Sequence, residues 1–131
     1  MNKVYLLGAG PGDKEYILPK AVSMMKEVCG IIGAERLLPV LSELTGRTEG
    51  FYPFRKIDDT LELAEELLKK GDVAITVSGD PLLYSFFKTI QRKRPEWDIE
   101  VIPGIGSLQM LGAAFGQTME EAAIISVHGR K

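Results

Sequence analysis

Short apolar runs alternate with longer stretches of helical periodicity along most of the chain. The runs are too short for helices and several carry β-branched residues, which is typical of buried strands. We predict strands at residues 4–7, 30–34, 73–77, 99–102 and 123–127. The run at 73–77 is apolar or β-branched throughout, so we expect it in the centre of a sheet, covered on both faces.

The stretches between these runs have the spacing of amphipathic helices. The clearest covers residues 58–70, where apolar residues recur at helical intervals, acids stand at the start and Lys69-Lys70 at the end. Further helices are predicted at residues 18–28, 35–44, 83–93 and 106–115. This alternation predicts one α/β fold, a mostly parallel sheet of about five strands with helices on both faces.

Composition and charge narrow the function classes. The chain has 131 residues and a formal net charge of −2, from 16 Lys and Arg against 18 Asp and Glu. A chain of this length favours a single domain, and the lack of a basic excess argues against a nucleic-acid partner. One cysteine allows no disulfide framework, and no apolar stretch is long enough for a membrane span or a signal peptide. We expect a cytoplasmic protein with no membrane partner.

Three glycine-bearing loops follow predicted strands, at residues 8–13, 78–85 and 103–107. We call them the first, second and third loops. In a parallel sheet, ligands bind outside the carboxyl ends of the strands, so the three loops together predict a ligand pocket. The first loop departs from a dinucleotide fingerprint, because Asp13 replaces the last glycine and Pro19 delays the helix. Alone, it is as consistent with a tight structural turn as with a binding site.

The second and third loops each combine glycine with a polar residue. Gly79 lets a ligand approach the main chain, while Asp80 either belongs to the site or caps the next helix, and both roles are compatible. Ser107 is a candidate helix N-cap in the third loop. Aromatic residues at the end of the second loop and just after it, at positions 84, 86 and 87, either wall a pocket or fill the core.

The chain lacks the residues of several common catalytic sites. It has no nucleophile-elbow pattern, no Walker pattern and no spacing that suggests a metal site. His128 is the single histidine, and we interpret it as structural. A reaction that needs no activated protein nucleophile fits this inventory. Methyl transfer from a sulfonium is one, because positioning of donor and acceptor supplies much of the rate.

The three loops together resemble the motifs of the tetrapyrrole methylase family, in order and in spacing. The stretch from Val4 to Asp13 resembles the opening motif, Gly79-Asp80-Pro81 the cofactor loop, and residues 103–107 the third motif. The resemblance implies the family's α/β fold and S-adenosylmethionine as cofactor. It also implies cofactor contacts, mostly through the backbone, at Pro11, Ser78, Gly79, Asp80, Leu83, Gly106 and Ser107.

Within the family, residues 103–109 and 125–130 are most similar to the branch that methylates a precorrin or cobalt-precorrin ring carbon in cobalamin biosynthesis. This resemblance implies a small-molecule tetrapyrrole substrate that carries many carboxylates. Basic side chains near the site would then matter. The candidates are Arg36, Arg55, Lys56 and Arg130. No catalytic general base can be named from the sequence.

The resemblance also bears on domain organisation. Family members carry a second α/β domain, so we expect residues 1–131 to be the N-terminal α/β domain, with the usual C-terminal domain absent from this chain, and the full-length protein to be a homodimer. Two alternatives remain open. One is a methylase of the same fold that acts on ribosomal RNA or a translation factor, which the acidic net charge disfavours for RNA. The other is a non-catalytic nucleotide-binding module, against which Pro11 and Asp13 count.

Overall fold

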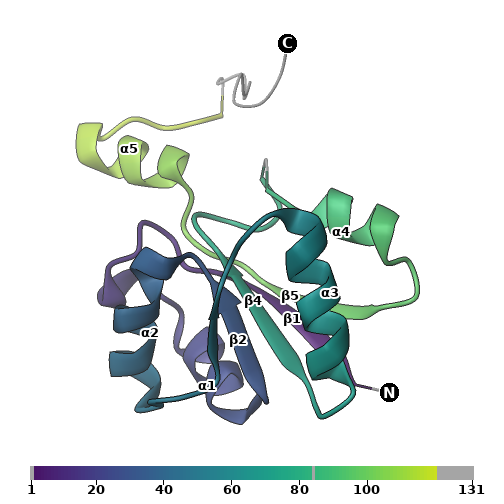
Figure 1. The fold of residues 1–131 in the computed structure, drawn as a ribbon. Helices are drawn as coiled ribbons and strands as arrows, with labels where there is room; N and C mark the ends of the chain where they lie inside the picture. The colour runs from purple at the N-terminus through teal and green to yellow at the C-terminus, as the bar shows by residue number, and fades with distance from the viewer. Residues whose placement is uncertain (1, 84, 121–131) are drawn as a thin grey trace.

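The computed structural model describes residues 2–83 and 85–120. Within them, five strands form one sheet in the order β3-β2-β4-β1-β5, and every adjacent pair is parallel (Figure 1). The strands are β1 (Lys3–Gly8), β2 (Gly30–Gly33), β3 (Phe51–Pro53), β4 (Val73–Val77) and β5 (Asp98–Ile102). The predicted α/β fold is confirmed, with residues 73–77 as the central strand.

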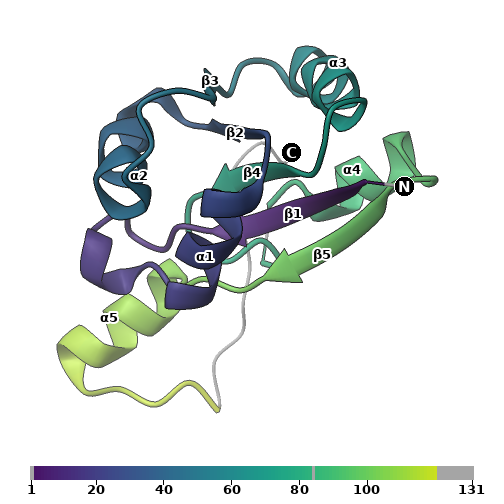
Figure 2. The ribbon, with the colours of Figure 1, turned by 90° about the horizontal axis from the view of Figure 1, so that it is seen from below.

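Helices cover both faces of this sheet, as Figure 2 shows. The covering helices are α1 (Pro19–Glu27), α2 (Leu38–Thr45), α3 (Ile57–Leu68) and α4 (Phe87–Lys93), and α5 (Ser107–Phe115) lies apart from them; short 3-10 turns occur at Lys14–Tyr16 and Glu35–Leu37. Buried residues of α1 and α2, such as Met25 and Leu41, form one core layer. Leu61 of α3 and Ile90 of α4 belong to the other. None of the described helices is long and apolar enough to cross a lipid bilayer.

The central strand β4 explains why the sheet needs both layers. All five of its residues are buried. Ala74 packs into the core with α1 and α2, whereas Val73 and Ile75 pack with α3 and α4. Successive side chains of a strand point to opposite faces, so a continuous apolar run requires cover on both.

Strand β3 was not among the predicted strands. It has only three residues and ends at Pro53, and it follows Gly50, which adopts a left-handed φ of 85°. Proline cannot donate to a neighbouring strand, so it is tolerated here because β3 is an edge strand. The strand predicted at residues 123–127 lies outside the described residues.

Helix α4 starts at Phe87, four residues later than the pattern predicts. The Asp80 carboxylate accepts a hydrogen bond from the backbone N–H of Leu82 at 3.1 Å, and the Asp80 carbonyl accepts one from Leu83 at 3.2 Å. These bonds hold the chain in a turn after β4. A side chain that bonds its own local backbone competes with helix formation, which accounts for the late start.

Helix α5 differs from the other four helices because none of its side chains is buried among the described residues. It extends beyond the carboxyl edge of the sheet (Figure 1). Leu111 is 56% exposed and Phe115 is 72% exposed. The helix ends at Gly116, whose left-handed φ of 64° suits a C-cap.

Candidate functional site

The three loops meet at the carboxyl edge of the sheet. The backbone N–H of Gly79 donates to the carbonyl of Gly10 at 2.9 Å, and the Gly10 N–H donates back to Gly79 at 3.2 Å. Ala9 continues this pairing by donating to the carbonyl of Val77 at 2.7 Å. The first and second loops are therefore held together by backbone hydrogen bonds. The convergence that the sequence predicts is present.

The third loop packs against the first and second loops through a close approach of Gly8, Gly79 and Gly104. A Cβ added to Gly104 would lie 2.2 Å from the Gly79 carbonyl oxygen and 2.8 Å from the Cα of Gly8. A Cβ on Gly8 would lie 2.6 Å from the Cα of Gly104. No side chain fits between these backbones. Gly8 and Gly104 therefore pack the loops against one another, which is the structural role left open for the first loop.

Gly79 has different surroundings from Gly8 and Gly104. It adopts a left-handed φ of 68°, and the nearest atom to an added Cβ would be the Cα of Gly106, at 3.9 Å. The direction in which a side chain would project is thus open, between the second and third loops. A glycine that leaves open space beside exposed backbone lets a ligand lie against main-chain atoms. This geometry fits a donor held mainly through the backbone.

The other second-loop candidates lie beside Gly79. Ser78 is exposed, and Asp80 and Leu83 are half-buried. Since Asp80 stabilises the turn at Leu82 and Leu83 and α4 begins only at Phe87, Asp80 is not the cap of that helix. Its side chain fixes the course of the backbone that leaves Gly79.

Pro11, Gly106 and Ser107 complete the predicted set. Pro11 is exposed in a turn that the Gly12 N–H closes by donating to the Ala9 carbonyl at 3.1 Å. Gly106 is buried and is the extended N-cap residue of α5, so Ser107 is the first helical residue and not the predicted cap. The structure thus places all seven predicted cofactor positions on three loops that touch one another.

Three of the four predicted basic residues are on the same edge of the sheet. Arg36 follows β2, and Arg55 and Lys56 follow β3; all three are exposed. The Arg36 guanidinium reaches the first loop, with Nη1 3.7 Å from the position of a Cβ on Gly12. None of these three side chains takes part in an ion pair within the described residues. Arg130 and His128 lie outside the described residues.

An aromatic pair at this edge was only half anticipated. Phe54, just after β3, stacks on Phe86, which follows the second loop, with ring centroids 5.0 Å apart. Phe86 is one of the aromatic residues that the sequence indicates as a pocket wall or core residue, whereas Phe54 is not among them. The contact joins residues distant in the chain, and the only available signal was an aromatic residue directly before Arg55.

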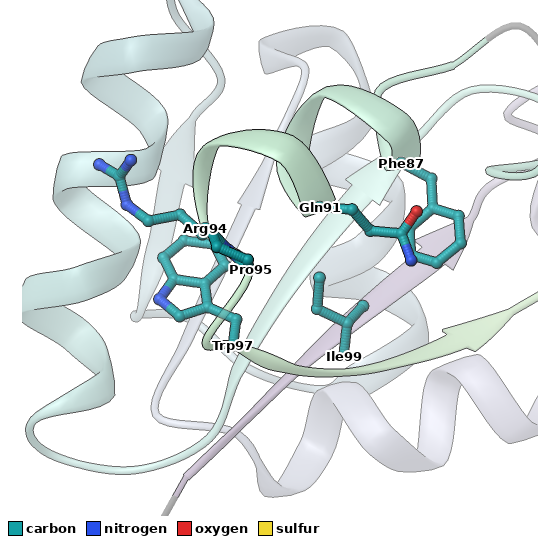
Figure 3. Close-up of a pocket in the computed structure, with 6 residues that line it drawn as sticks. All are labelled: Phe87, Gln91, Arg94, Pro95, Trp97 and Ile99. Atoms are coloured by element: carbon teal, nitrogen blue, oxygen red, sulfur yellow. The ribbon is translucent and has the colours of Figure 1, made fainter.

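A separate pocket of about 330 Å³ lies between α4 and β5 (Figure 3). It is lined by Phe87, Gln91, Arg94, Pro95, Trp97 and Ile99. Arg94 is already engaged there, because it pairs with Glu65 of α3 and lies 5.8 Å from the Trp97 ring centroid. No described residue of the three loops lines this pocket, and we place the candidate site at the loops, where the predicted cofactor positions lie. Over the part of the chain that is described, no three His, Cys, Asp or Glu residues gather as a metal site would require.

Comparisons with known proteins bear on the family and the fold. A sequence profile of the tetrapyrrole (corrin/porphyrin) methylases matches residues 3–131. The probable cobalt-precorrin-7 C(5)-methyltransferase of Methanocaldococcus jannaschii is 32% identical to this chain, over 98% of this chain and 61% of that protein.

Solved structures share the fold. The cobalamin biosynthesis precorrin-6Y methylase of Archaeoglobus fulgidus superposes with a TM-score of 0.81 at 19% identity, over 97% of this chain and 65% of that one. A uroporphyrin-III C-methyltransferase of Thermus thermophilus, solved with S-adenosylhomocysteine, has a TM-score of 0.63 at 26% identity, over 85% of this chain and 48% of that one. The chain thus spans less than two thirds of the length of these relatives.

Proposed function

The chain belongs to the tetrapyrrole methylase family, and from this membership we propose that the protein is an S-adenosylmethionine-dependent methyltransferase. Its substrate would be a precorrin or cobalt-precorrin, methylated at a ring carbon in cobalamin biosynthesis. The relative from Methanocaldococcus jannaschii, named a probable cobalt-precorrin-7 C(5)-methyltransferase, supports this branch of the family. Residues 1–131 would be the N-terminal α/β domain, which carries the three loops.

The observation that carries the proposal is the open space at Gly79. Among the described residues, a Cβ added to Gly79 would approach only the Cα of Gly106, at 3.9 Å, while Gly8 and Gly104 pack the three loops against one another. In the proposal, the seven positions named above contact the donor, mostly through backbone atoms; the N–H and C=O of Gly79 already pair with Gly10, so Gly79 contributes a close packing surface. The relative solved with S-adenosylhomocysteine supports this choice of ligand. When bound, the donor would supply an electrophilic methyl group to a nucleophilic ring carbon.

The part played by the chain is orientation. Backbone groups fixed by the Gly10–Gly79 hydrogen bonds and by the Asp80 turn are preorganised, so they would hold a ligand in one geometry with little loss of freedom on binding. Alignment of two reacting groups can supply several kcal/mol of the barrier reduction, up to about 10 kcal/mol. No side chain is assigned as a general base.

Isothermal titration calorimetry tests donor binding. We expect heat of binding with S-adenosylhomocysteine and none with NAD or ATP. A methyl-transfer assay on the full-length protein, with cobalt-precorrin as acceptor and labelled donor, then tests the reaction. Heat from NAD but none from S-adenosylhomocysteine would contradict the proposal and favour a nucleotide-binding module.

The alternatives have less support. Helix α1 begins only at Pro19, well after the first loop, which does not fit a dinucleotide fingerprint. The net charge of −2 does not favour ribosomal RNA as a substrate. Parallel assays with ribosomal RNA and with a translation factor as acceptors check these alternatives directly.

Two further properties belong to the same proposal, namely a cytoplasmic location and a homodimer in the full-length protein. The exposed apolar residues of α5, Leu111 and Phe115, support an interface on that helix. Light scattering of the full-length protein should give twice the mass of one chain. A monomer at all concentrations would contradict the dimer.

A further inference from the structure

Apolar side chains are exposed at the carboxyl edge beside the candidate donor site. Phe86 is 39% exposed and Leu82 is 59% exposed, and both lie on the connection between β4 and α4. Phe86 stacks on Phe54, at an interplanar angle of 26°. The Phe54 N–H donates to the Gly33 carbonyl at 2.7 Å, which fixes Phe54 at the end of β2. The aromatic pair is therefore anchored to the sheet and partly open to solvent.

Two cations lie directly next to this pair in the chain. Arg55 and Lys56 are exposed, and no ion pair uses them in the described part of the chain. Asp58, an acid in the first turn of α3, is held by Lys93 at 2.6 Å. Asp59 is the other acid of that turn. The charge of Asp58 is thus already compensated. Asp59 is exposed and, like Arg55 and Lys56, takes part in no ion pair in the described part of the chain, so the two cations exceed the one uncompensated acid here.

The edge is divided into two parts of different chemistry. The ends of β1, β4 and β5 present backbone around Gly79 and Gly106. The ends of β2 and β3 present Phe54, exposed cations and the Arg36 guanidinium near Gly12, and Phe86 stacks on Phe54 from the connection after β4. Apolar surface beside cations suits a ligand that is flat and apolar at its centre and carries carboxylates at its rim.

We propose that Phe54 and Phe86, with Arg55 and Lys56, determine specificity for the methyl acceptor. The aromatic pair contacts the ring system of the acceptor, and the two cations bind its peripheral carboxylates. This inference rests on the proposed function and deepens it, because it assigns the acceptor to the β2–β3 side of the edge and the donor to the β1–β4–β5 side. The connection after β4 carries both Gly79 and Phe86, so a single segment of nine residues joins the two parts.

Porphyrin titrations of the full-length protein test the assignment. The probe is a porphyrin with eight carboxylates, followed by absorbance and fluorescence, and S-adenosylhomocysteine affinity is measured in parallel. The double variant Arg55→Glu/Lys56→Glu should weaken porphyrin binding at least about tenfold. Phe86→Leu, which keeps an apolar side chain but removes the ring, should weaken it about threefold. Donor affinity should change less than about twofold in both variants.

The matched control is Lys70→Glu/Arg92→Glu. It makes the same change in net charge, at exposed positions that precede β4 and β5 on the amino side of the sheet. This control should retain porphyrin affinity. Equal weakening in the edge variant and the control, or no weakening in the edge variant, would overturn the inference. So would a wild-type protein that binds S-adenosylhomocysteine but no porphyrin. Failure to bind S-adenosylhomocysteine would instead count against the proposed function.

Discussion

The two ends of the same sheet are built in different ways. At the amino end, side chains close the structure: the Lys3 N–H donates to Asp72 Oδ1 at 2.7 Å, and Asn2 Nδ2 donates to the Leu68 carbonyl at 2.7 Å. The Lys3 ammonium also pairs with Glu100 at 3.3 Å. This hydrogen bond, with the nearby Asp98 charge, raises the pKa of Lys3 above its ordinary value.

At the carboxyl end, backbone hydrogen bonds and close packing of glycines hold the loops together. Gly10 and Gly79 pair through their main chains, and Gly8 and Gly104 pack without side chains. Exposed cations and the Phe54–Phe86 stack lie beside them. The two ends therefore differ in what holds them together: side chains bond to backbone at the amino end, and glycine backbones pack directly on one another at the carboxyl end. This difference is consistent with the proposed donor site at the carboxyl end.

The largest expected effect comes from Gly104→Ala. Its new Cβ would lie 2.2 Å from the Gly79 carbonyl oxygen, so the loops must move apart. We expect the free energy of unfolding to fall by about 3 kcal/mol and donor binding to be lost. Urea denaturation and calorimetry measure the two effects. Gly71→Ala is the control at the amino end, where the new Cβ would make an ordinary 3.4 Å contact with the Cys29 Cβ. Wild-type donor affinity in Gly104→Ala would contradict the claim that close packing of the loops at the carboxyl end forms the donor site.

Gly79→Ala separates backbone strain from obstruction of the site. Gly79 and Gly46 have similar left-handed φ values, 68° and 73°, and neither would place a Cβ in close contact. Both alanine variants should lose about 1 kcal/mol of unfolding free energy. Only Gly79→Ala should reduce S-adenosylhomocysteine affinity, at least about tenfold by calorimetry. Equal affinities in the two variants would show that the Gly79 side of the loop is not a binding surface.

Asp72→Ala probes the amino end. Without the carboxylate the half-buried Lys3 N–H loses its acceptor, so the free energy of unfolding should fall by about 1 kcal/mol. Donor affinity should remain that of the wild type. A large loss of donor affinity with an intact fold, checked by circular dichroism, would mean that the two ends are not functionally separate.

The smallest effect concerns a surface ion pair. The Lys93 ammonium, which donates a hydrogen bond to Asp58, holds the pKa of Asp58 below its ordinary value. A carboxylate whose pKa is lowered by folding stabilises the protein at pH values above its pKa in the unfolded state. This stabilisation is lost as the pH falls through the pKa of the folded state. In Lys93→Met the pKa of Asp58 should rise, as followed by NMR titration, with no change in donor affinity at neutral pH. An unchanged pKa would refute the pairing.

The sequence determines the core of this fold more clearly than its edges. Residues 73–77 are correctly placed because a continuous apolar run has few alternatives to a central strand. Strand β3 escapes detection, because three residues that end in proline carry almost no periodicity. The late start of α4 depends on a turn made by the Asp80 side chain, which competes with an otherwise helical pattern.

The candidate site was predictable as a set of loops but not in its detail. Glycines after three strands indicate a shared edge. That Gly8 and Gly104 are packing residues, while Gly79 faces open space, depends on contacts between residues far apart in the chain. The left-handed φ of Gly79 likewise means that any side chain there costs stability, a penalty that the sequence alone does not reveal. The Phe54–Phe86 stack also joins residues far apart in the chain, so the sequence alone does not predict it.

Backbone amide mapping by NMR tests the central claim most directly. On addition of S-adenosylhomocysteine, the account predicts the largest chemical-shift changes at the amides of Gly10, Gly12, Gly79, Gly106 and Ser107. The chemical shifts of amides at the amino end, such as those of Lys3 and Asp72, should not change. Shifts concentrated at the amino end, or around the pocket between α4 and β5, would contradict the assignment of the three loops as the donor site.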